Sequence, residues 1–423
     1  MTMLEIIFWL SAACVVYTYI GYPLLLAVMA RLRPRGTTRV GHSPDMPVSV
    51  VLAAHDEESR IGARIRELVE IVAARPAGGE VIVVSDGSTD RTVQMARAAA
   101  AETELATEGR IPVCVLVQGT NLGKAMALNQ AHAVACHPLL VFADARQNWA
   151  DDAIDRLLVP FADPAVGAVS GDLVLESAPG VMAGVGLYWR FEKWLRRTES
   201  RFDSMVSVTG CISAVRRELF PKLPAGTILD DVYWPLTVAM GGHRVVHEER
   251  AKAFDRSPEK ARDEFRRKVR TLAGNFQLMT RLPAALVPWR NRLWWQFVSH
   301  RALRLVVPWA LLALLIVAAT LPGSLYRFAF WSQASFYLVG LAGCWPVVAT
   351  RSRLASGIAS FLVLNAAAWV GFWVWMSGSA ARSWGKVSYE RVVSPIREDQ
   401  AMPCTDPQRA LELCASPRRE MNP

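Results

Sequence analysis

The sequence predicts an α/β fold, in which a domain with a mostly parallel β-sheet is joined to α-helices that span a membrane. Two patterns support this prediction. Between residues 46 and 282, short apolar runs alternate with helical stretches, as in a parallel sheet covered by helices on both faces. Near the N-terminus and after residue 300, longer runs without charged side chains can cross a hydrocarbon layer of roughly 30 Å.

The composition agrees with a membrane protein that contacts anionic groups. The chain has 423 residues, of which 52% are hydrophobic, and its formal net charge is +9 at pH 7. A basic chain of this kind suits anionic lipid headgroups, nucleic acid or phosphorylated substrates. Nucleic acid is excluded as an expected partner, because the basic residues cluster beside the apolar runs and no recognition motif is present.

The first apolar run, from Ile6 to Ala30, contains no charged side chain, and arginines follow it at positions 31, 33, 35 and 39. Because positive charge stays on the cytoplasmic side, the N-terminus is expected outside and the following domain in the cytoplasm. A signal peptide usually has a basic start and a shorter apolar core. Residues 1–35 are therefore predicted to be an uncleaved transmembrane helix with a basic flank.

The C-terminal part contains three further runs without charge, at residues 305–321, 328–349 and 354–376. Residues 303–378 are therefore predicted to hold three transmembrane segments. Three crossings would leave the tail outside, although its first basic residues favour the inside. The proline and charge content of this tail, residues 379–423, predicts partial disorder.

Residues 283–302 join the domain to these runs, and their aromatic and aliphatic side chains alternate with arginines. This pattern predicts an amphipathic helix lying in the membrane interface. An ordinary amphipathic helix packed on a soluble core is the alternative. The whole chain is expected to be a multi-pass protein of a plasma membrane, most simply a bacterial inner membrane.

The domain over residues 46–282 is expected to begin with four strands, at 47–55, 79–86, 112–118 and 138–144. Helices are expected between them, over residues 58–74, 89–101 and 124–135. Polar side chains follow three of the strands: His55, Asp56 and Glu57 after the first, Asp86 after the second and Asp144 after the fourth. Ligands of open α/β sheets bind beyond the carboxyl ends of the strands, so these residues are candidates for a site. Helix capping by acids and Gly-Ser turns is the alternative.

Six motifs occur in order over residues 46–275: VSVVLAAHDEES, VIVVSDGSTDRT, NLGKAMALN, FADAR, TGCISAVRREL and LDDVYWPL. Together they resemble the family 2 glycosyltransferases, which are inverting enzymes with a nucleotide-sugar-binding fold of the GT-A type. With apolar helices on both sides, the chain is similar to the integral-membrane branch that makes polysaccharides.

The resemblance implies a nucleoside-diphospho-sugar as the donor substrate, with UDP as the expected carrier. His55 would lie beside the nucleobase, and Glu57 and Asp86 would hydrogen-bond the base and ribose. Lys124 would lie near the diphosphate, and Asp144 would face the ribose and phosphate.

On the acceptor side, the resemblance implies that Gly210 and Cys211 line the site and that Asp231 is the general base. The chemistry agrees, because an attacking hydroxyl must lose its proton and a carboxylate can accept it. Asp230 and Asp231 raise each other's pKa if they lie close together, which suits a base. The alternative is that both acids only favour the positive end of a helix dipole.

At one point the sequence departs from the family pattern, which usually reads Asp-x-Asp and helps to hold a divalent metal. Here it reads Asp144-Ala145-Arg146, and a guanidinium cannot bind Mg²⁺ or Mn²⁺. We expect Arg146 to supply part of the positive charge that a metal would bring, while Asp144 remains the one candidate metal ligand. The alternative is an ion pair of Arg146 with Asp144 or Asp151.

A second departure concerns the Gln-x-x-Arg-Trp motif that membrane synthases of this family use to bind the growing chain and the diphosphate. The corresponding stretch has Arg267, Arg270 and Thr271 in the glutamine, arginine and tryptophan positions. Threonine offers no flat face for a sugar ring, which argues against processive polymerisation. Arg267 and Arg270 are expected to bind diphosphate or lipid phosphate, or only anionic headgroups.

Three functions fit these observations. The first is transfer of a sugar from the nucleotide to a growing polysaccharide or lipid-linked oligosaccharide, and the TGCISAVRR and LDDVY motifs favour it. The second is synthesis of a polyprenyl-phosphate monosaccharide, and the third is a membrane scaffold with an inactive domain. Membrane lipids are expected partners in each case. The sequence leaves open whether a homo-oligomer or an export partner takes part.

Overall fold

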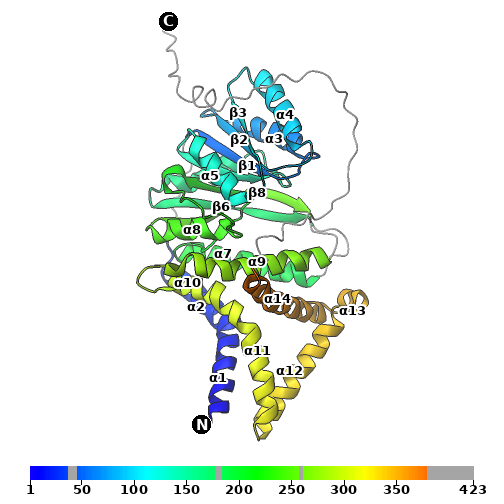
Figure 1. Cartoon of the computed structure of the whole chain (residues 1–423). Coiled ribbons are helices and arrows are strands. Elements are labelled where there is room, and N and C mark those ends of the chain that lie inside the picture. Colours follow the sequence, from blue (N-terminus) through cyan, green and yellow to red (C-terminus); the bar gives the residue numbers. More distant parts are fainter. Residues whose placement is uncertain (37–44, 177–182, 257–260, 379–423) are drawn as a thin grey trace.

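The computed structural model describes residues 1–36, 45–176, 183–256 and 261–378 (Figure 1). The tail predicted to be partly disordered lies outside these residues. The domain contains an eight-stranded sheet with the order β3-β2-β1-β4-β7-β6-β8-β5. Its strands are β1 Val48–Ala54, β2 Gly79–Asp86, β3 Val113–Gln118, β4 Leu139–Asp144, β5 Asn148–Trp149, β6 Val166–Glu176, β7 Ile212–Arg216 and β8 Arg244–Arg256.

The sheet confirms the predicted mostly parallel arrangement. Strand β1 pairs in parallel with β2 and β4, and β2 pairs in parallel with β3, whereas β7 runs antiparallel to both β4 and β6. In the parallel register Ala53 lies opposite Asp144, and Ala54 lies opposite Ser85. The carboxyl ends of β1, β2 and β4 therefore meet at one edge of the sheet.

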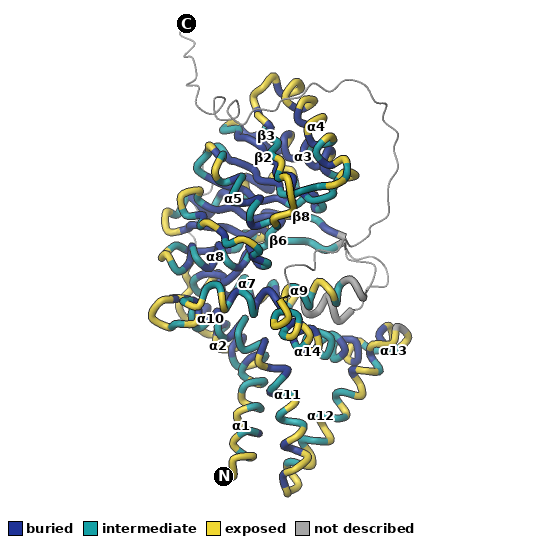
Figure 2. Tube along the Cα trace, viewed as in Figure 1, coloured by how far each residue is buried: buried dark blue, intermediate teal, exposed yellow. Residues whose placement is uncertain are grey.

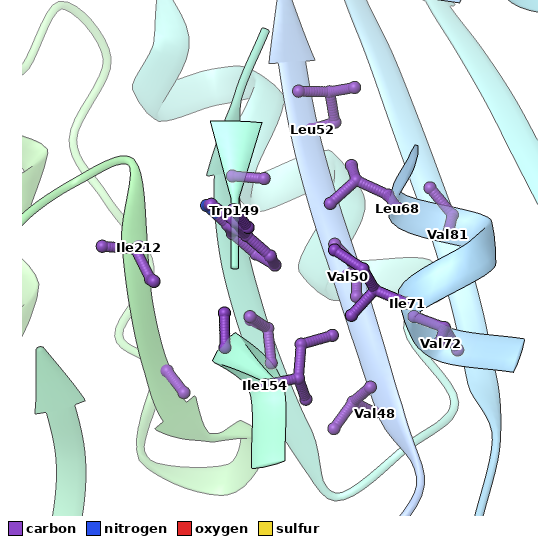
Figure 3. Close-up of a cluster of buried hydrophobic side chains, with 14 of the residues drawn as sticks. Val48, Val50, Leu52, Leu68, Ile71, Val72, Val81, Trp149, Ile154 and Ile212 are labelled. Carbon is purple, nitrogen blue, oxygen red and sulfur yellow. The ribbon is translucent and has the colours of Figure 1, made fainter. Parts of the chain in front are cut away.

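Helices cover both faces of the sheet, and the alternation of side chains along β1 shows why. Val48, Val50 and Leu52 lie in one buried cluster with residues of α3 (Ile61–Ala73) and α4 (Thr92–Ala106), as Figure 3 shows for α3. Val51, from the same strand, lies in the opposite cluster with residues of α5 (Lys124–Val134) and α8 (Asp230–Met240). Successive strand residues face opposite sides, so a continuous apolar run fills both cores.

The apolar helices extend from one end of the domain (Figure 1). Helix α1 (Met3–Val16) continues through a π-helical stretch, η1 (Tyr17–Gly21), into α2 (Tyr22–Leu32). Figure 2 shows exposed residues along α1, α11 (Leu303–Thr320) and α12 (Ser324–Ala342), where these helices leave the domain. Within the described residues, three helices are long and apolar enough to cross a membrane, and they cover residues 3–32, 294–320 and 353–376.

The expected interfacial helix over residues 283–302 does not form as one element. It is divided into a 3₁₀ turn, η4 (Pro283–Leu286), a loop, and the beginning of the long helix, α10 (Trp294–Phe297) and η5 (Val298–Ala302). The loop is tied to the domain because Arg292 donates to the carbonyl oxygens of Ala239 and His243, at 2.8 and 2.7 Å. These contacts attach the loop to the end of α8 and the residue before β8.

The apolar runs at residues 328–349 and 354–376 do not each form a simple crossing helix that leaves the domain. The run over residues 328–349 is divided between α12 and α13 (Pro346–Arg351), and α14 (Arg353–Met376) lies directly beneath the domain (Figure 1). Helix α14 packs on α9 (Ala261–Arg281) and α7 (Ala183–Phe202). At Gly371 a Cβ atom would lie 3.0 Å from the backbone nitrogen of Ala273, so glycine permits this close packing.

Candidate active site

A fixed loop beyond β2 shapes the edge where the polar residues meet. The carboxylate of Asp86 is buried and accepts hydrogen bonds from the backbone N–H groups of Leu122, at 2.7 Å, and Gly123, at 2.9 Å. Gly87 has a φ of +61°, and a Cβ there would lie 2.2 Å from the backbone nitrogen of Asn121. Asp86 thus positions the loop that begins α5, while its expected contact with a donor remains a prediction.

Lys124 is the first residue of α5 and lies among carboxylates. Its Nζ donates to Asp144 Oδ1 at 2.7 Å and lies 3.9 Å from Asp230 Oδ2. Burial would lower the pKa of Lys124, but Asp144 and Asp230 outweigh it and raise that pKa. Partial burial likewise opposes ionisation of Asp144, but Lys124 and Arg146 hold its pKa below the usual range. The pair is therefore fully charged at neutral pH.

Asp230 and Asp231 occupy the first turn of α8, where the helix dipole favours negative charge. Burial, opposed by Lys124 and reinforced by Asp231, raises the pKa of Asp230 to about 6. Burial also raises the pKa of Asp231, although Arg301, Lys124 and Arg196 oppose it. Two adjacent carboxyl groups with raised pKa values are suited to accept a proton near neutral pH.

The loop before β7 closes one side of this acidic group. At Gly210, a Cβ atom would lie 3.5 Å from Asp231 Cβ and 3.7 Å from Lys124 Nζ, so the backbone of Gly210 faces both residues. The side chain of Cys211 instead lies in the core, and burial raises the pKa of its thiol. Its carbonyl oxygen accepts from Trp149 Nε1 at 3.0 Å. Of the two residues expected to line the acceptor side, Gly210 is the one that faces the acids.

The residues after β1 lie at the same edge. His55 donates from Nδ1 to the carbonyl oxygen of Asp86 at 2.7 Å, and its Nε2 lies 3.6 Å from Asp56 Oδ2. Burial raises the pKa of Glu57, although Arg60, at 3.4 Å, opposes this effect. The structure thus brings His55 beside Asp86, while Glu57 interacts electrostatically with Arg146 and Asp144 at the same edge.

Arg146 makes an ion pair that the sequence did not suggest. Its Nη2 lies 2.6 Å from Asp255 Oδ2 on β8, and Gln147 Nε2 donates to the same oxygen at 2.9 Å. The expected alternative was an ion pair of Arg146 with Asp144 or Asp151, and the partner in the structure is Asp255. Arg146 nevertheless influences Asp144, because it helps to lower the pKa of that carboxyl.

The side chains present do not fit a divalent metal. Asp144 already carries Lys124 on its carboxylate, and Arg146 occupies the position of a second acid. The described residues contain no group of three histidine, cysteine or acidic side chains that could hold a metal ion. The side chains beside Asp144 are the cations Lys124 and Arg146, whereas Mg²⁺ needs oxygen ligands.

The two arginines expected on α9 differ in their surroundings. Arg270 interacts electrostatically with Asp230 and Asp231, and burial lowers the pKa of its guanidinium. Arg267 is exposed and lies 3.5 Å from Glu264, one turn earlier on the same helix. The structure therefore brings Arg270 toward the acids and leaves Arg267 at the surface.

Two further arginines belong to the site, although no motif marks them. Arg64 on α3 is almost fully buried and donates from Nε to the carbonyl oxygen of Asp144 at 3.2 Å. Arg301, at the beginning of the long apolar helix, opposes the rise in the pKa of Asp231. The only sequence signal was a charged residue within an otherwise apolar or amphipathic run.

The GT-A arrangement of the sheet and the acids at its carboxyl edge define a glycosyltransferase domain. Residues 49–223 match the model of the glycosyl transferase family 2, so the chain contains a domain of that family.

Two curated relatives and one solved structure are similar to the chain. A dolichyl-phosphate β-glucosyltransferase from Drosophila melanogaster is 35% identical over 108 residues, 24% of this chain and 32% of that protein. A poly-β-1,6-N-acetyl-D-glucosamine synthase from Staphylococcus aureus is 21% identical over 240 residues, 55% of this chain and 56% of that protein. The chain therefore spans between a third and about half of the length of these relatives.

Among solved structures, a mannosyltransferase from Pyrobaculum calidifontis in complex with GDP-Man and Mn²⁺ superposes with a TM-score of 0.63. It is 23% identical, and the match covers 88% of this chain and 99% of that one. At this identity the match shows the fold.

Proposed function

We propose that the chain is a membrane-bound inverting glycosyltransferase that moves a sugar from a nucleoside-diphospho-sugar to a hydroxyl group. The observation that carries this proposal is the meeting of Lys124, Asp144, Asp230 and Asp231 at the carboxyl edge of the sheet. The family 2 domain and its relatives support the same reaction class.

Each residue has a defined part in this proposal. The acceptor oxygen attacks the anomeric carbon, its proton moves to Asp231, and the bond from that carbon to the diphosphate oxygen breaks. Negative charge grows on the leaving nucleoside diphosphate, and Lys124 and Arg270 are the cations placed to stabilise it. His55 and Glu57 are proposed to contact the nucleoside.

We further propose that fixed cations take the place of a divalent metal here. Lys124 is held on Asp144 at 2.7 Å, and Arg146 is held on Asp255 at 2.6 Å. Both side chains are thus preorganised in the donor region, and Arg146 stands where the family pattern has a second acid. A preorganised cation stabilises developing charge without a metal.

The membrane location rests on the apolar helices. Helices α1 and α11 carry large exposed apolar side chains, among them Leu10 and Ile316, which would be unfavourable in water. The basic flank after α2 contacts the domain, because Arg35 lies 2.9 Å from Asp203. This arrangement supports a plasma-membrane protein with the domain on the side where basic residues collect, the cytoplasm.

A second candidate, transfer to a polyprenyl phosphate, is favoured by the similarity to the dolichyl-phosphate β-glucosyltransferase. The two candidates differ in their need for a base. A hydroxyl must lose a proton during attack, whereas a phosphate oxygen is already ionised at neutral pH. The acid pair with raised pKa values at the start of α8 favours the hydroxyl acceptor.

The test is a product assay with the purified full chain in detergent, offered several UDP- and GDP-sugars with membrane lipid extract as acceptor. We expect one donor to be consumed and Asp231→Asn to lower the rate on the order of 10² to 10⁴-fold. Unchanged turnover in Asp231→Asn would reject the hydroxyl acceptor. Absence of turnover with every donor would favour the scaffold. Product length would separate a polymerase from a single-addition enzyme.

A further inference from the structure

A cavity of about 440 Å³ lies where the apolar helices meet the domain. Its lining is mostly apolar and comes from η1, α7, α9, α11 and α14. The side chains that matter here are Tyr19, Phe191, Leu272, Phe361, Leu364 and Arg304. Both the volume and the mostly apolar lining with a few polar groups are typical of ligand sites.

One charged side chain, that of Arg304, reaches this cavity from α11. Its Nη1 lies 2.9 Å from Glu192 Oε2, and Glu192 also accepts from His300 Nε2 at 2.8 Å. Burial would raise the pKa of Glu192, but Arg304 and His300 outweigh it and hold that pKa well below its usual range. The polar end of the cavity is thus a fixed ion pair of Glu192 and Arg304 beside apolar helices, an arrangement that marks function.

A second guanidinium lies one helical turn from Arg304, on the side of the acids. Arg301 donates from Nη2 to Ser207 Oγ at 2.5 Å, and within the described residues its buried Nε has no hydrogen-bond acceptor. Arg196 on α7 donates to Thr209 Oγ1 at 3.4 Å. The arginines are therefore arranged along the short segment from Ser207 to Thr209.

The same segment leads directly to the proposed base. The backbone N–H of Val208 donates to the carbonyl oxygen of Asp231 at 2.9 Å, and Gly210 faces the Asp231 side chain. Arg301 also interacts electrostatically with Asp231. An anion bound at Arg301 would thus lie between the apolar cavity and Asp231.

We propose that this cavity binds the apolar chain of the acceptor, which is a lipid phosphate or diphosphate carrying the reactive hydroxyl. The apolar chain of the lipid lies against Phe191, Leu364 and their neighbours, and the phosphate lies against Arg301, near Arg196 and Arg304. A sugar attached to that phosphate would then present its hydroxyl to Asp231. This inference rests on the proposed function, and it gives that function its acceptor class.

The probe is farnesyl phosphate, with farnesol and inorganic phosphate as matched halves, and binding to the full chain in detergent is measured by native mass spectrometry. We expect saturable binding of farnesyl phosphate and at least about tenfold weaker binding of each half. Equal binding of farnesol and farnesyl phosphate would overturn the phosphate site.

Two variants distinguish the site that binds the apolar chain of the lipid from the site that binds its phosphate. Leu364→Trp fills the cavity and should weaken farnesyl phosphate binding by more than about tenfold, whereas the control Leu338→Trp, on the exposed side of α12, should not. Arg301→Gln should weaken farnesyl phosphate but not farnesol. Retained binding in both Leu364→Trp and Arg301→Gln would reject the inference.

Failure of this inference can be told apart from failure of the proposed function. Asp231→Asn should bind farnesyl phosphate as the natural chain does, because the base does not hold the lipid. Nucleotide binding to Leu364→Trp, measured by calorimetry with UDP and GDP, checks that the domain is folded. If lipid binding fails while donor turnover persists, the acceptor class is wrong and the transferase remains.

Discussion

Lys124 Nζ lies 2.7 Å from Asp144 Oδ1, and this contact joins the beginning of α5 to the end of β4. The same ammonium group lies 3.9 Å from Asp230. One cation therefore connects the donor region with the acid pair at the start of α8. Several consequences can be measured.

Lys124→Ala removes the cation proposed to stabilise the leaving diphosphate. We expect turnover to fall about 10² to 10³-fold, as when a preorganised group that stabilises transition-state charge is lost. Lys124→Arg should recover part of this loss because it keeps the charge. The control is Arg66→Ala, which breaks an exposed ion pair with Glu102 and should leave turnover unchanged. Normal turnover in Lys124→Ala would contradict the assigned role.

The raised pKa of the acid pair predicts an acid limb in the pH profile. A base must be ionised, so the rate constant should fall as the pH decreases through the pKa of Asp231, which burial raises above its usual range. The charge of Asp231 helps to raise the pKa of Asp230, so the two carboxyl groups titrate as a pair and Asp230→Asn should move this limb. The profile of kcat/KM is the measurement, and an unmoved limb in Asp230→Asn would separate Asp230 from the base.

Asp230 should also cost stability at neutral pH. Its pKa is raised on folding, so the stability that it contributes is present below its unfolded pKa and is lost as pH rises through about 6. Asp230→Asn should therefore raise the melting temperature at neutral pH while lowering activity. The difference should vanish in acid, and thermal melts in detergent across this pH range test the sign.

We expect donor turnover to continue in the presence of a metal chelator. Lys124 and Arg146 are proposed to supply the charge that a metal would bring, so donor turnover in excess EDTA should stay within about twofold of the untreated rate. Arg146→Ala should lower turnover under both conditions, because Asp255 loses the guanidinium of its ion pair and the donor region loses a cation. Loss of activity in EDTA that Mn²⁺ restores would reject this replacement scheme.

The strands and the edge at which their polar residues meet could be predicted from sequence, because apolar alternation and strand ends are local features. The partner of Arg146 could not be predicted in this way. Asp255 lies 109 positions away along the chain. It comes close to Arg146 because β8 pairs antiparallel with β5, a long-range contact that a local pattern does not reveal. The role of Arg64 was also hidden, since an arginine within an amphipathic helix normally faces water.

The placement of the last apolar helix could not be predicted from the sequence either. Composition identified residues 354–376 as apolar and uncharged, but not that they lie along the domain. That placement depends on a close approach at Gly371 and on Phe276 stacking with Trp375 at 5.7 Å between ring centroids. Apolar content alone does not distinguish a helix surrounded by lipid from one that packs on protein.

Gly87 tests whether the loop held by Asp86 matters for the donor site. In Gly87→Ala the added Cβ would lie 2.2 Å from the backbone nitrogen of Asn121, so the loop before Lys124 must move. We expect weaker nucleotide binding and a loss of about 1 to 3 kcal/mol in stability. Gly109→Ala is the matched control, because φ is +73° there and no atom lies within 4 Å of the added Cβ. Equal effects of the two variants would show only backbone strain.

Glu192 should couple the apolar helix to the domain. It pairs with Arg304 at 2.9 Å and with His300 at 2.8 Å, and its removal would take the carboxylate away from a largely buried guanidinium. Glu192→Ala should therefore destabilise the chain by about 3 to 5 kcal/mol, seen as a lower melting temperature in detergent. Glu192→Gln keeps the shape but not the charge, and a substantial part of the loss should remain. The control is Glu80→Gln, since among the described residues that buried carboxylate accepts from the Ser49 hydroxyl and the Cys136 backbone N–H, which are neutral, and should lose less. If Glu192→Gln has the same melting temperature as the natural chain, the charge of Glu192 does not hold the long apolar helix to the domain. Packing around Tyr22 and Trp295 must then hold it instead.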